Sequence, residues 1–135
     1  MRFMVILKGT PESEKKAPDP QLMAEMGKFN EELIKAGIVL AMDGLQPSSK
    51  GARVKFSGKN RTVIDGPFTE AKELIAGFWI WQVKSKEEAV EWAKRAPFGD
   101  GVTLELRQIF EPGDLPVSPE TQALEAKLRK ELGSR

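Results

Sequence analysis

The 135-residue sequence predicts an α+β domain with a ferredoxin-like antiparallel sheet that carries its helices on one face. Segments typical of strand, helix, strand, hairpin, strand, helix and strand follow one another along the chain. The two helices follow the first and third strands of a four-stranded core, which puts both on the same side of the sheet. An apolar content of 40% against a charged content of 30% supports a folded core and excludes a disordered chain.

Apolar runs mark the four core strands. Residues 3–7 form the first run, which is shorter than the apolar region of a signal peptide. Residues 9–18 are rich in proline, serine and charge, and they predict a mobile connection. Strands are then predicted at 38–42, 75–83 and 102–110. None of these runs reaches the ~20 apolar residues that cross a bilayer, so we expect no membrane span.

Capping residues mark the two core helices. The first is predicted over residues 20–36, where Asp19 caps the start and apolar side chains recur every three or four residues. Ser85 and Glu88 form a capping box that begins the second helix, and Pro97 ends it. Each helix therefore has one apolar face for the sheet.

An additional hairpin lies between the second and third core strands. Residues 53–56 and 61–64 flank a polar turn, which predicts two paired strands. The sequence Asp65-Gly66-Pro67-Phe68 then ends the pairing, because proline has no N–H to donate to a ladder.

Prolines and glycines after residue 111 mark a boundary between a domain at 1–115 and a helical extension at 116–135. Leu124, Leu128 and Leu132 recur every four residues and predict a C-terminal helix. So narrow an apolar stripe is marginal alone, so we expect the helix to dock on the body or on another subunit. The alternative is a solvated tail.

The central strands are apolar on both faces. In the strand at 75–83, Phe78 and Ile80 point to one face while Trp79 and Trp81 point to the other. A strand of this kind needs cover on both sides, and the chain has core helices for one side only. We therefore expect a homodimer packed sheet against sheet. The alternative is that the C-terminal helix covers the second face.

The composition excludes several kinds of chemistry. The chain has no cysteine, histidine or tyrosine, which removes thiol nucleophiles, disulfides and the usual general base near neutral pH. It also lacks a nucleotide-binding glycine loop and a calcium-type acidic loop, so no cofactor and no metal is predicted. The missing thiols and targeting signals indicate a cytoplasmic protein.

Carboxylates and arginines remain as candidate site residues. Asp65 at the turn is a candidate general base or ligand-binding carboxylate, with a hydrogen-bonded turn cap as the alternative, and Asp43 resembles it. Glu105 and Arg107 share one face of the last strand. Together with Arg53 of the hairpin, they would bind a carboxylate or phosphate if they converged in a dimer cleft. The alternative is solvated ion pairs.

Three further features have a functional and a structural interpretation. Lys72 would form a Schiff base only if it were buried. Trp79 and Trp81 are candidates for an aromatic ligand pocket, although core anchors are the favoured interpretation. A positive cluster on the hairpin suggests nucleic acid or an acidic protein, but a charge-protected strand edge is favoured and direct nucleic-acid binding is not expected. The cluster consists of Lys50, Arg53, Lys55, Lys59 and Arg61.

An ordered set of short segments runs along the chain, namely Phe29-Asn30-Glu31-Glu32-Leu33, residues 44–49, Asp65-Gly66-Pro67-Phe68, Gly77-Phe78-Trp79-Ile80 and residues 87–93. Over about residues 1–115 this set resembles the DGPF branch of the YCII-related proteins. The resemblance implies a ferredoxin-like fold assembled as a dimeric α/β barrel. Some members of the wider group carry a His and Asp pair in the cleft, which cannot be placed here because histidine is absent. The branch is often encoded with, or fused to, sigma-factor-like proteins.

Two functions follow from these features. The first is a homodimer that binds a small polar or anionic molecule in an inter-sheet cleft, with weak acid/base catalysis by Asp65 and Arg107. The second is a non-enzymatic interaction module that holds a transcription-associated protein. Association beyond a dimer stays open.

Overall fold

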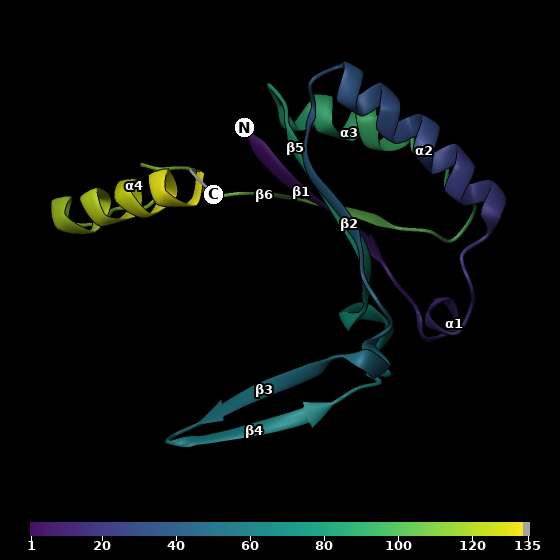
Figure 1. The fold of residues 1–135 in the computed structure, drawn as a ribbon, viewed down its shortest axis with the longest axis horizontal. Helices are drawn as coiled ribbons and strands as arrows, with labels where there is room; N and C mark the ends of the chain where they lie inside the picture. The colour runs from purple at the N-terminus through teal and green to yellow at the C-terminus, as the bar shows by residue number, and fades with distance from the viewer. Residues whose placement is uncertain (134–135) are drawn as a thin grey trace.

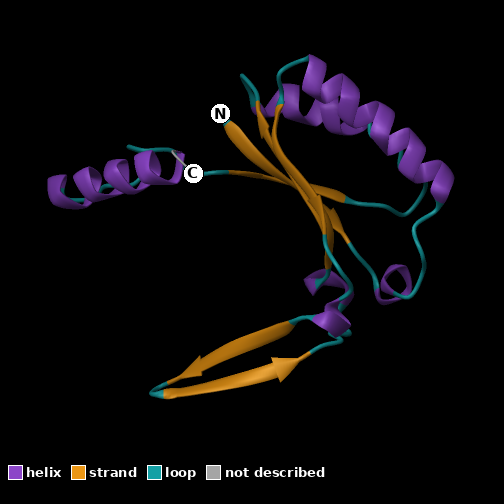
Figure 2. Cartoon of the chain, in the orientation of Figure 1, coloured by secondary structure: helices purple, strands orange, loops and turns teal. Residues whose placement is uncertain are grey.

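The computed structural model describes residues 1–133 and contains a four-stranded antiparallel sheet in the order β2-β5-β1-β6 (Figure 1). Helices α2 and α3 lie together on one face of this sheet, as Figure 2 shows. The predicted α+β class and its antiparallel sheet are confirmed. The bounds are β1 Arg2–Lys8, β2 Val39–Gly44, β5 Ile75–Gln82, β6 Leu104–Gln108, α2 Pro20–Lys35 and α3 Lys86–Lys94.

The core lies between the sheet and these two helices. Trp79 and Trp81 of β5 point toward α2, where the ring centroids of Phe29 and Trp79 are 6.2 Å apart at an interplanar angle of 90°. The Trp79 Nε1–H donates to Asn30 Oδ1 at 2.9 Å, so the indole is satisfied at the edge of the core. The other buried core residues are Phe3, Val5, Leu33, Ile38, Val83 and Ala89.

Residues 9–18 differ from the predicted mobile connection, because they contain the short helix α1 (Pro11–Glu14). The Thr10 hydroxyl accepts from the Ser13 N–H at 3.0 Å, and the Ser13 side chain bonds back to the Thr10 N–H. This reciprocal cap stabilises a turn that has no apolar stripe and was therefore invisible to periodicity. The last strand is shorter than predicted, at 104–108 rather than 102–110.

Two segments project from the body as arms. Strands β3 (Ala52–Ser57) and β4 (Asn60–Asp65) pair only with each other, which confirms the extra hairpin. Helix α4 (Pro119–Gly133) forms the second arm, and residues 134–135 of the predicted extension lie outside the described residues. Figure 1 shows both arms on the side of the sheet opposite α2 and α3.

Helix α4 does not dock on its own domain. Leu124, Leu128 and Leu132 are 54%, 51% and 70% exposed, so the leucine stripe is uncovered. The alternative in which this helix covers the second sheet face is therefore wrong within one chain. Docking on another subunit stays a prediction.

The base of the hairpin is held by hydrogen bonds between distant connections. The Glu14 carboxylate accepts from the Ser48 N–H at 2.8 Å and from the Ser48 hydroxyl at 2.7 Å. The Ser48 Oγ accepts in turn from the Phe68 N–H at 3.0 Å. These bonds join α1 to two connections, the 3₁₀ turn η1 (Ser48–Lys50) and the Asp-Gly-Pro-Phe turn.

The close approach of the two connections requires glycine at position 66. A Cβ on Gly66 would lie 1.7 Å from the carbonyl oxygen of Ser48, and the Gly66 N–H donates to Gly51 O at 3.0 Å. The turn therefore positions the hairpin through backbone contact, which no larger residue permits.

We predict opposite effects of alanine at two glycines. Gly66→Ala should lower the free energy of unfolding by about 1–3 kcal/mol, because the new methyl group meets backbone that must shift. Gly27 is an exposed residue of α2, and a Cβ added there would have no atom within 4 Å beyond its chain neighbours and the helix backbone. Gly27→Ala should therefore raise the free energy of unfolding by roughly 1 kcal/mol through helix propensity. Urea denaturation measures both values. Equal effects would contradict the packing of the turn.

Candidate functional site

The sheet face opposite α2 and α3, here called the open face, has an apolar centre. Met4 and Ile6 of β1 lie beside Ile80 and Phe78 of β5 in the strand register. All four side chains are only partly buried, although they occupy the two central strands. Apolar groups in the middle of a sheet are normally covered, so this centre is a candidate interface.

Charged residues flank the apolar centre at both sheet edges. The register places Asp43 of β2 opposite Phe78, and Glu105 of β6 opposite Ile6. Asp43 and Glu105 therefore share one row of the open face but are separated by three strand spacings, roughly 14 Å. The structure puts both predicted residues on this face without bringing them together.

Arg107 is a highly exposed cation on the open face. It lies opposite Met4, its side chain is 73% exposed, and its Nη1 donates to Glu105 Oε2 at 3.3 Å. This contact is long and exposed, so it contributes little stability. The guanidinium has five N–H donors, and most of them stay available to a carboxylate or phosphate.

An arginine and a glutamate that the sequence did not single out adjoin Arg107. Arg2 shares the open face with Met4, and its Nε and Nη2 donate to the Glu111 carboxylate at 2.7 and 3.4 Å. These hydrogen bonds lower the pKa of Glu111, and the positive charge of Arg2 adds to the effect. Arg2, Glu105, Arg107 and Glu111 together form what we call the β1–β6 charge cluster.

Arg53 has a structural contact instead of a place on the open face. Its Nη1 forms an ion pair with Glu73 Oε2 at 3.0 Å, and its guanidinium lies 3.6 Å from the ring centroid of Phe68. The ion pair ties the hairpin to the 3₁₀ turn η2 (Ala71–Glu73). Arg53 therefore fixes the hairpin base and is not positioned beside Arg107.

Asp65 and Lys72 lie near the hairpin base and are exposed. Asp65 ends β4 opposite Ala52, whereas Arg107 lies across from Met4, near the start of β1. The far end of β1 approaches the hairpin base, since Lys8 Nζ donates to the Lys72 carbonyl oxygen at 3.0 Å. One chain therefore holds the two predicted catalytic residues at opposite ends of the sheet. Exposure of Lys72 also removes the condition for a Schiff-base lysine.

Trp79 and Trp81 are core residues in the structure. They are 5% and 0% exposed and point toward α2, away from the open face. An aromatic pocket built on these rings is therefore not retained, and the core interpretation agrees with their burial. The alternative interpretation of Asp65 as a turn cap finds no contact at Phe68, because the Phe68 N–H donates to the Ser48 hydroxyl.

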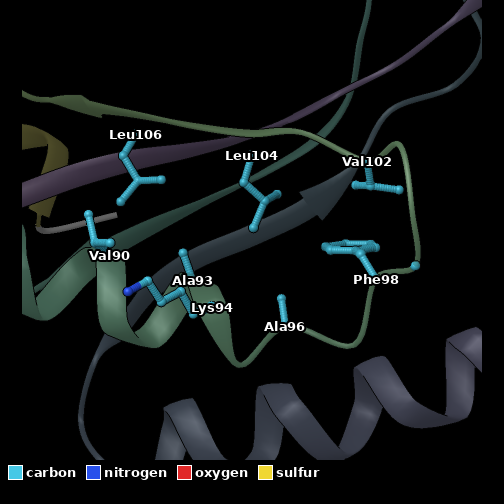
Figure 3. Close-up of a pocket in the computed structure, with 9 residues that line it drawn as sticks. Val90, Ala93, Lys94, Ala96, Phe98, Val102, Leu104 and Leu106 are labelled. Carbon is cyan, nitrogen blue, oxygen red and sulfur yellow. The ribbon is translucent and has the colours of Figure 1, made fainter.

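A separate pocket of about 410 Å³ lies between α3 and β6 (Figure 3). Its walls are apolar side chains such as Ala93, Phe98 and Leu106. Lys94 is the only charged residue that lines it, and the Lys94 Nζ pairs with Glu91 Oε1 at 3.0 Å. None of the predicted site residues lines this pocket, and it contains no acid and base in contact.

Residues 1–133 contain neither a metal-type acidic cluster nor a candidate membrane span. No group of three or more acidic side chains lies close enough together to hold a metal ion. No helix of that part of the chain has the length and apolar content of a membrane span.

The comparison with known families decides the relationship. The family model of the YCII-related domain matches residues 1–112. This chain belongs to the YCII-related family. A relative, the uncharacterised protein R00369 of Rhizobium meliloti (strain 1021), is 29% identical over 105 residues, which cover 75% of this chain and 85% of that protein. The narrower placement in the DGPF branch stays a prediction.

We predict that Arg2 controls the ionisation of Glu111. Nuclear magnetic resonance titration should give Glu111 a pKa below its ordinary value, and Arg2→Met should return that pKa toward normal. A lowered pKa means that the pair stabilises the fold above the ordinary pKa and loses this effect as pH falls through the lowered one. The stability difference between the two proteins should therefore shrink in acid.

Arg95→Met is the matched control, because Arg95 pairs with Glu32 on the helix side of the sheet. It should leave the pKa of Glu111 unchanged. An ordinary pKa for Glu111 in the unaltered protein would contradict the assigned contact.

Proposed function

We propose that this YCII-related protein is a homodimer whose two open faces pack together, and that the cleft between them binds a small anionic molecule at Arg107. The observation that carries the proposal is a partly exposed apolar sheet centre flanked by the β1–β6 charge cluster. An apolar surface with a polar rim is the usual composition of an interface.

The apolar centre supports self-association. Ile80, Phe78, Met4 and Ile6 lie on the two central strands, where neither α2 nor α3 reaches. A second copy offers an identical apolar surface, and a twofold axis makes such a surface self-complementary. Packing sheet on sheet would bury these side chains as a sandwich core does.

The charge cluster supports anion binding. In a cleft with little water, the guanidinium of Arg107 would interact more strongly with a carboxylate or phosphate than it does at an exposed surface. Glu105 lies beside it and would accept a proton from a bound acid. A step that uses Asp65 together with Arg107 requires Asp65 from a second copy, since one chain separates them.

A second candidate is the non-enzymatic module that holds a transcription-associated protein. The hairpin supports it, because its apolar side chains Val54, Phe56 and Val63 present 52%, 69% and 63% of their surface to solvent. Basic residues lie next to these side chains on the same hairpin. The two candidates differ in whether a small molecule binds the purified protein.

We predict that the open face controls association. The unaltered protein should sediment as a dimer at micromolar concentration, and Ile80→Glu should sediment as a monomer, because it places a charge in an apolar interface. Met23→Glu, an exposed position on α2, should stay dimeric. A monomeric unaltered protein would remove the basis of the cleft.

We predict that anions stabilise the protein through Arg107. Inorganic phosphate or a small dicarboxylate, at a hundred times its dissociation constant, should stabilise the native state by about 2.7 kcal/mol and raise the melting temperature by several degrees. Chloride at equal ionic strength is the control for salt. Arg107→Ala should abolish the shift, whereas Lys28→Ala on the outer side of α2 should keep it. No shift with any anion would favour the interaction module.

A further inference from the structure

The hairpin has one largely apolar face that no other helix or strand within residues 1–133 covers. The register puts Val54 opposite Val63, Phe56 opposite Arg61 and Ala52 opposite Asp65, all on one face. Val54, Val63 and Phe56 are each more than half exposed. A two-stranded hairpin is marginally stable in water by itself, so this face needs a covering layer.

Helix α4 likewise has an apolar stripe that is left exposed. Its leucines 124, 128 and 132 form a single exposed stripe, and the helix has no buried residue. A helix stripe packed on the apolar face of a sheet is the common way for both elements to bury their side chains. Figure 1 shows that the two arms of one chain are well separated, so the covering helix must come from elsewhere.

The charges next to each apolar surface favour pairing between the two kinds of arm. Three residues before and after Leu128 stand Glu125 and Glu131, which lie beside it on the helix. The apolar face of the hairpin carries Arg61, Lys59 lies in the turn next to it, and the one acid of the hairpin is Asp65 at the base. Packing α4 on the hairpin would place these glutamates near Arg61 and Lys59.

We propose that α4 of one copy packs its leucine stripe on the apolar face of the β3–β4 hairpin of a second copy, and that the contact is reciprocal. This proposal rests on the homodimer of the proposed function. Both arms project on the side of the open face, which is the side that the second copy occupies (Figure 1). A twofold axis that joins α4 to the hairpin joins the hairpin to α4 as well.

Reciprocal packing has a consequence for the anion site. Asp65 shares the hairpin face with Val63, so it faces the second copy. Helix α4 follows β6, the strand that carries Arg107. The pairing therefore places the hairpin of one copy, with Asp65 at its base, on the helix that follows the Arg107 strand of the other copy.

The absence of cysteine allows a direct test with the 135-residue chain. Val63→Cys is made in an untagged chain and Leu128→Cys in a chain lengthened by a tag, and the two are mixed and oxidised. The expected product is a disulfide between the two different chains, in clear excess over either self-linked product. Lys28→Cys in place of Val63→Cys is the control and should reduce that product to the background level.

The possible outcomes separate the two proposals. Excess Leu128→Cys self-linkage would overturn the hairpin contact in favour of paired α4 helices. A disulfide that forms at high dilution within one chain carrying both Val63→Cys and Leu128→Cys would overturn the contact between copies in favour of contact within a chain. A dimer by sedimentation without the mixed disulfide would reject the arm contact and keep the homodimer, whereas a monomer by sedimentation would reject both.

Discussion

A sheet whose central strands are apolar on both faces is stable only when both faces are covered, and this chain covers one. Helices α2 and α3 bury Trp79, Trp81 and their neighbours, which supplies the core of the domain. Met4, Ile6, Phe78 and Ile80 on the other face keep partial exposure. The proposed association depends on that imbalance, and the charge cluster and both arms lie on the uncovered side.

The hairpin is an arm of fixed direction because its base is tied down. Ser48 connects Glu14 to Phe68, while Arg53 contacts both Phe68 and Glu73. These partly buried contacts involve residues that looked like loop or candidate site residues in the sequence. Their role is to hold a surface in place, which the chemistry of the individual side chains does not indicate.

Local patterns were sufficient for most of the fold. The period of α2 and the cap at Ser85 placed the core helices, and apolar runs placed the strands within a few residues. The alternation in β6 also put Glu105 and Arg107 on one face correctly. The local patterns did not predict long-range contacts. Arg2 and Glu111, for example, are 109 residues apart, and no local signal links them.

Other differences have a similar origin. A strand pattern shows that two side chains share a face but not which face the helices cover, so Trp79 was open to both a core and a pocket interpretation. Asp65 and Arg107 were predicted to act together because local sequence patterns do not give the distance between the hairpin and the last strand. Helix α1 escaped notice because its only signal is a polar cap.

Dilution of the protein should lower the local stability of the exposed arms more than that of the core. A lone chain keeps its helix-covered core but leaves both extremities without neighbours, so they would be the first parts to fray and the first to be cut by proteases. In the proposed pairing, their order would rise with protein concentration while the core stayed constant. Abundance in the cell would then set how much of each chain is fully folded.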